Sequence, residues 1–132
     1  MKNRYFIIPI DPYTQDILFI IGDEKYCDKV SKRLLGDNFE KTEHASSSSL
    51  GYTKVVKNQF ILICMPKFDN TFDDYETLIH ECVHAISMMY TIKGMSLKMN
   101  KINDQESMAY LTGYLFSRAL MKLVPAKKKR RR

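Results

Sequence analysis

The residues with the clearest chemical potential are His80, Glu81 and His84, inside a stretch from 72 to 93 whose apolar residues recur at helical spacing. A helix turns once in about 3.6 residues, so two histidines four positions apart share one face. Two imidazoles placed in this way are able to bind one zinc ion, and the glutamate between them is able to act as a general base for a zinc-bound water molecule. The alternative is a pair of surface histidines on the polar side of an amphipathic helix. The specificity of the motif favours the metal site.

A hydrolytic zinc site needs a third protein ligand, and the candidate is Glu106 near the start of the last predicted helix. Ala109, Gly113 and Ser117 follow it on the same helical face. Small side chains let two helices approach closely, so this row predicts that the two helices pack there and carry Glu106 to the histidines.

Other assignments for this position stay open. Asn103 and Glu106 have the spacing of a capping box, in which Glu106 only caps its own helix. Asp104 and Asp73 are the alternative third ligands.

The segment from Thr77 to Ala85, followed by Glu106 to Tyr110, resembles zinc metallopeptidases of the gluzincin type. The run from Glu106 to Leu115 is most similar to small phage- or prophage-encoded proteins of this kind. The resemblance covers about residues 60 to 120 and implies a zincin-like core with one zinc ion, Glu106 as third ligand, and a peptide or protein substrate. One departure is Tyr110, where gluzincins often place an acidic residue that orients a histidine.

The mechanism expected from these residues is hydrolysis of a peptide bond. Zinc lowers the pKa of a bound water, Glu81 takes its proton, and the hydroxide attacks the carbonyl. The oxyanion needs a further donor, for which Tyr75, Tyr110 and Tyr114 are all candidates.

Two rival functions remain. The first is a non-catalytic binding protein on the same fold, whose basic tail contacts nucleic acid or an acidic partner. The second is a structural zinc ion, which is less favoured because such sites usually have four ligands, and Cys82 is predicted to point away from the histidines.

Charge is concentrated at the end of the chain. The net charge of +6 equals the six consecutive cations Lys127–Arg132, so the remainder is formally neutral. We expect one domain over residues 1–124 and a disordered basic tail over 125–132, which is either a partner contact or a solvated end. Three scattered cysteines and the lack of a long apolar run predict a cytoplasmic protein that does not enter a membrane, in the host cytoplasm if phage-encoded.

The predicted fold class is α+β, with a small, mostly antiparallel sheet of three or four strands. Apolar runs and turn residues predict strands over 4–10, 16–21, 51–56 and 59–65. Helices are expected over 23–35, 72–93 and from 103 or 104 to 123. The polar segment 37–49, which contains His44, is expected to be a loop.

Overall fold

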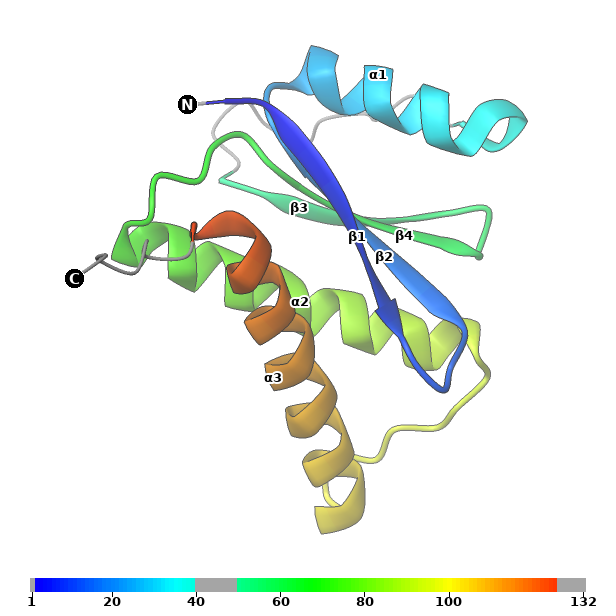
Figure 1. Ribbon diagram of the computed structural model, residues 1–132. Coiled ribbons are helices and arrows are strands. Elements are labelled where there is room, and N and C mark those ends of the chain that lie inside the picture. The colour runs from blue at the N-terminus through cyan, green and yellow to red at the C-terminus, as the bar shows by residue number, and fades with distance from the viewer. Residues whose placement is uncertain (1, 40–49, 126–132) are drawn as a thin grey trace, which may run out of the picture.

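The computed structural model describes residues 2–39 and 50–125 (Figure 1). Its elements follow in the order β1 (Arg4–Ile10), β2 (Gln15–Ile21), α1 (Glu24–Leu35), a short 3₁₀ turn (Gly36–Asn38), β3 (Tyr52–Val56), β4 (Phe60–Met65), α2 (Phe72–Ile92) and α3 (Ile102–Leu123). The sheet is covered by α1 on one face and by α2 and α3 on the other (Figure 1).

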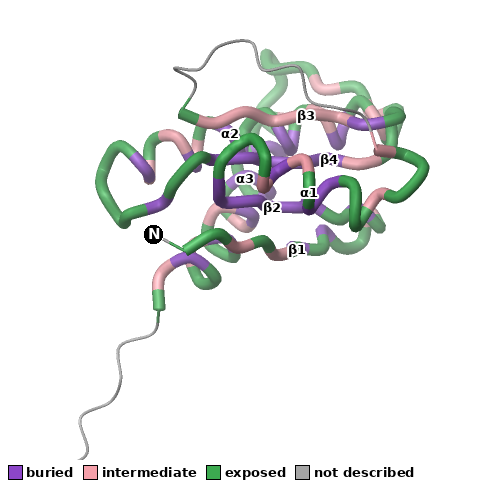
Figure 2. The backbone as a smooth tube through the Cα atoms, turned by 90° about the horizontal axis from the view of Figure 1, so that it is seen from above, coloured by how far each residue is buried: buried purple, intermediate pink, exposed green. Residues whose placement is uncertain are grey.

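The sheet has four strands in the order β1-β2-β4-β3. The pairs β1–β2 and β3–β4 are antiparallel, whereas β2 and β4 run parallel. The predicted α+β class and the mostly antiparallel sheet are therefore confirmed. The two central strands are the most deeply buried, and β3 lies at an edge (Figure 2).

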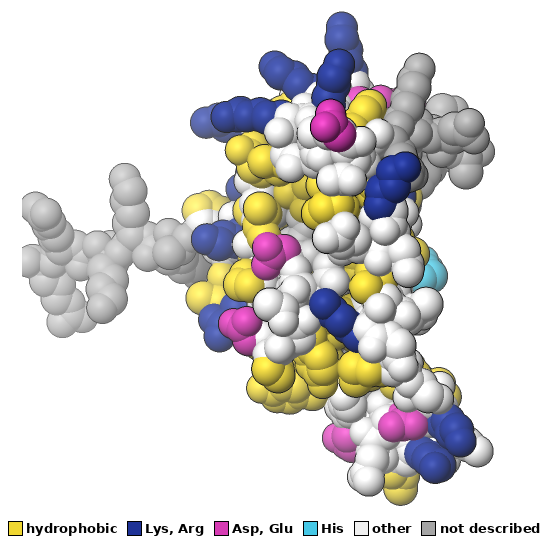
Figure 3. All heavy atoms as spheres, turned by 90° about the vertical axis from the view of Figure 1, so that its right-hand side faces the viewer, with side chains coloured by type: hydrophobic (Ala, Val, Ile, Leu, Met, Phe, Trp, Pro, Cys, Tyr) yellow, Lys and Arg dark blue, Asp and Glu magenta, His cyan; other side chains and the backbone are white. Residues whose placement is uncertain are grey.

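Two cores form because alternate strand residues point to opposite faces. On β2, Ile17, Phe19 and Ile21 pack into the larger core with α2 and α3. Leu18 and Ile20 pack against α1 in the smaller core. Lys and Arg side chains gather over the solvent side of α1 (Figure 3), as expected for the charged face of a surface helix.

Helix α2 begins and ends where the sequence predicts. Thr71 is the N-cap of a capping box with Asp74, and Gly94 follows the helix with a positive φ of 67°. The apolar residues that recur at helical spacing in this segment are not all buried, because Phe72 is 90% exposed and Val83 43% exposed.

Helix α3 does not bury the face of small side chains, Ala109, Gly113 and Ser117, that the sequence predicts. Its N-cap is Lys101, so Asn103 does not open a capping box with Glu106. The side chains buried on this helix are Met108, Leu111, Thr112, Leu115, Ala119 and Leu123. Although this helix is apolar almost all round, which predicts that most of it is buried, Ile102, Tyr110 and Met121 are more than half exposed, so that prediction is wrong.

The first two residues of the predicted loop 37–49 belong to the 3₁₀ turn. The rest of that prediction from residue 40 on, including His44, lies outside the described residues, as does the basic tail Lys127–Arg132. Within the described ranges, no helix is long and apolar enough to cross a lipid bilayer.

Candidate metal centre

His80 and His84 lie side by side on the exposed face of α2. Their Nε2 atoms are 3.1 Å apart, and the two rings meet edge to face with centroids 4.7 Å apart. At this distance two neutral imidazoles share one hydrogen bond, in which one Nε2–H donates to the other Nε2.

The same spacing fits two ligands of one metal ion. Tetrahedral zinc holds imidazole nitrogens at about 2.0–2.1 Å, which places two of them about 3.3 Å apart. The observed separation of the two Nε2 atoms, 3.1 Å, is close to this value. The pair therefore fits two of the positions around a zinc ion with little movement.

The Glu81 side chain points toward the sheet and borders the same cavity as His80. The residue is only 5% exposed, and Oε2 accepts a hydrogen bond from Oγ1 of Thr53 at 2.5 Å. The same hydroxyl lies 3.2 Å from the backbone carbonyl oxygen of Glu81. Thr53 belongs to β3, so this edge strand fixes the orientation of the carboxylate.

Close approach of β3 to α2 depends on Gly51, just before the strand. A Cβ atom at this position would lie 3.1 Å from Cγ2 of Thr77 on α2 and 3.2 Å from the carbonyl oxygen of Cys64 on β4. A larger residue would therefore push the start of β3 away from the helix.

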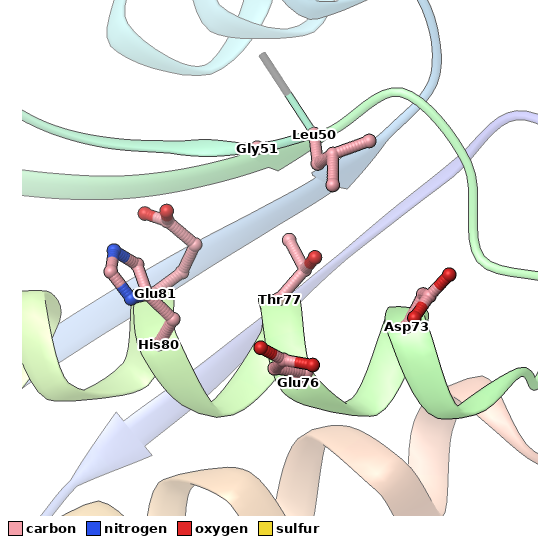
Figure 4. A pocket seen from close by; sticks show the side chains of 7 residues that line it. All are labelled: Leu50, Gly51, Asp73, Glu76, Thr77, His80 and Glu81. Atoms are coloured by element: carbon pink, nitrogen blue, oxygen red, sulfur yellow. The ribbon is translucent and has the colours of Figure 1, made fainter.

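A cavity of about 460 Å³ opens between the N-terminal half of α2 and the start of β3 (Figure 4). Its lining residues are Leu50, Gly51, Asp73, Glu76, Thr77, His80 and Glu81. In Figure 4 Glu81, Thr77 and Asp73 project upward from α2 into the space below Leu50, with the ring of His80 at its end. Part of the candidate centre thus borders a space large enough for a side chain of a bound molecule.

Glu106 does not join this group. It is exposed, and it lies nine residues before the buried Leu115, which places the two about 180° apart around α3. The row Ala109, Gly113 and Ser117 is also exposed, so the predicted packing of α2 against these small side chains is wrong. No described group of three or more His, Cys, Asp or Glu residues is arranged to hold a metal ion.

The remaining sequence candidates are scattered. Tyr110 is 73% exposed on α3, Tyr114 lies under the Arg118 guanidinium, and the Tyr75 hydroxyl bonds to Asn70. None of these three tyrosines is among the residues that line the cavity.

Of the two alternative acidic ligands, Asp73 lines the cavity, whereas Asp104 accepts a hydrogen bond from the backbone N–H of Lys98. The thiol of Cys82 is buried, and burial followed by the charge of Glu81 raises its pKa to about 12. A neutral buried thiol is a poor metal ligand.

Sequence reasoning missed Thr53 and Glu76. Thr53 gives no sequence signal, because its role depends on how β3 lies against α2. Glu76 carries one: it stands four residues before His80, and therefore on nearly the same helical face.

Comparison of the chain with family models, with curated proteins and with solved structures gives no match.

Proposed function

We propose that this chain is a zinc-dependent peptidase in which His80 and His84 bind the metal and Glu81 is the general base. The observation that supports it most strongly is the 3.1 Å approach of the two Nε2 atoms beside a carboxylate held by Thr53. This combination of residues at this spacing is characteristic of zinc hydrolases.

Each residue then has a separate task. When bound, zinc supplies Lewis-acid polarisation of water and of the peptide carbonyl. The Glu81 carboxylate accepts a proton from the attacking water and returns it to the leaving amine. The Thr53 hydroxyl restricts the rotation of that carboxylate, and β3 is the edge strand beside which an extended peptide would lie.

Glu106 stays in the proposal as the third ligand that the gluzincin resemblance implies. To reach the histidines it needs a rotation of α3 about its axis, because it lies on the face opposite the buried one. Its substitution is therefore an informative part of any metal-binding experiment.

A second candidate is a binding protein without catalysis. The observation that favours it is that the described residues bring only two histidines together, without a third ligand. Two protein ligands hold zinc less firmly than the three of most catalytic sites.

The two candidates are separated by a cleavage experiment. Zinc-loaded protein and its Glu81→Gln variant are incubated with a mixture of denatured proteins, and new chain ends are identified by mass spectrometry. A peptidase produces ends that the variant does not, although the variant keeps its zinc. Equal cleavage by both proteins would refute the role of Glu81, and no cleavage by either would favour the binding protein.

A further inference from the structure

Three of the described residues that line the cavity beside Glu81 are carboxylates. Asp73 and Glu76 are exposed at its outer part, and Glu81 is buried at its inner end. No Lys or Arg is among the described residues that line it. An adjoining cavity of about 190 Å³ includes Lys67, but that ammonium pairs with Asp69 at 3.6 Å.

The space is continuous with the candidate centre. Glu81 as a whole residue is only 5% exposed, yet it lines the same cavity as Asp73 and Glu76 (Figure 4). A concave surface that carries one sign of charge focuses its field on the interior and attracts the opposite charge. A molecule bound in it therefore lies next to these carboxylates and to His80.

We propose that this cavity binds a cationic group of the peptide substrate, an ammonium or a guanidinium, through Asp73 and Glu76; its assignment to a substrate rests on the proposed peptidase function. The helix rises 1.5 Å per residue, so Glu76 stands about 6 Å from His80 along α2, and Asp73 about 12 Å from Glu81. An extended peptide advances about 3.3 Å per residue. The cation therefore sits two to four residues from the bond that is cleaved.

Two sources supply such a cation: a Lys or Arg side chain, or a free N-terminal amine a few residues from the bond. Three alanine-rich octapeptide amides distinguish them. The first is N-acetylated with one lysine, the second is N-acetylated with norleucine at that position, and the third carries norleucine and a free N-terminus. Norleucine keeps the alkyl chain of lysine without its charge.

Binding is measured by NMR titration of the full-length Glu81→Gln protein, which prevents hydrolysis during the experiment. We expect the lysine peptide, the free-amine peptide or both to bind roughly three- to tenfold more tightly than the neutral peptide. This gain in affinity is the size expected from two partly exposed ion pairs. The gain should be lost after Asp73→Asn with Glu76→Gln. It should persist after Asp16→Asn with Asp37→Asn, which removes two exposed charges elsewhere.

Three results would overturn the proposal: equal binding of all three peptides, binding of none of them, or a gain that survives in the cavity variant. Failure of the proposed peptidase function is detected separately: the wild-type protein then neither binds zinc nor cleaves the denatured proteins. The peptide comparison needs neither zinc nor turnover, so its result stands on its own. The cavity variant should give the same circular dichroism spectrum as the wild type, which excludes a general loss of structure.

Discussion

Replacing Thr53 with valine tests whether β3 supports the general base. Valine has nearly the shape of threonine but cannot donate to Oε2 of Glu81, which now lies 2.5 Å from the hydroxyl. Glu81 is only 5% exposed, so water does not easily replace the lost donor. Loss of a partner from a buried polar group costs about 1–3 kcal/mol of unfolding free energy.

Thermal unfolding followed by circular dichroism measures this loss. For a domain of this size, about 1–3 kcal/mol corresponds to a decrease in Tm of roughly 4–12 °C. Thr53→Ser keeps the hydroxyl and is the matched control, for which a much smaller decrease is expected. Urea unfolding of the same variants gives the free-energy difference independently of the thermal scan.

A double-mutant cycle isolates the bond itself. In a Glu81→Gln background the charged acceptor is gone, so Thr53→Val should cost less than it does in the wild type, by about 1 kcal/mol. An unchanged Tm for Thr53→Val, or an equal cost in both backgrounds, would refute the reasoning that Thr53 holds the carboxylate.

Further predictions concern the elements around the centre. Gly51→Ala should destabilise the protein by about 1–3 kcal/mol, because an added Cβ lies 3.1 Å from its nearest neighbour. Gly113→Ala has open space around it and should stabilise α3 by roughly 1 kcal/mol. Urea unfolding of both variants measures the two changes in unfolding free energy. Burial alone would raise the pKa of Asp74, but hydrogen bonds from the backbone of Asp69 and from Thr71 outweigh it and lower the pKa below 3.8. Its contribution to stability is therefore present above pH 3.8 and lost as pH falls below it, and Asp74→Asn should flatten the pH dependence of urea unfolding in that acid range. The Cys82 thiol should resist iodoacetamide in the folded protein at pH 8, because its pKa is raised to about 12, and react after unfolding, as peptide mapping would show.

Local features of this fold were predictable because their causes are local. The Thr71–Asp74 capping box and the positive φ of Gly94 mark the ends of α2 within a residue or two. Lys57 and Asn58, which separate the predicted strands 51–56 and 59–65, form the hairpin turn, with both residues at positive φ. These elements depend on hydrogen bonds and backbone preferences that neighbouring residues supply.

The sheet order and the packing of α3 were not predictable in the same way. Parallel pairing of β2 with β4 joins strands separated by a helix and another strand, and no local signal specifies it. Helix α3 is apolar on several sides, so the sequence offered two faces for burial, and the chosen face contains Leu115 rather than Gly113. The position of Glu106 followed from that choice and could not be inferred from spacing.

Native mass spectrometry of the zinc-reconstituted chain tests the central claim most directly. We predict one zinc ion per wild-type chain, none in His80→Ala or His84→Ala, and retention in the surface control Asp37→Asn. Weaker zinc binding by Glu106→Ala would establish the third ligand that the resemblance implies. Unchanged binding would show that Glu106 is not a ligand and would leave His80 and His84 as the proposed ligands. A wild-type chain that takes up no zinc, or a His80→Ala variant that binds it equally well, would contradict the metal centre.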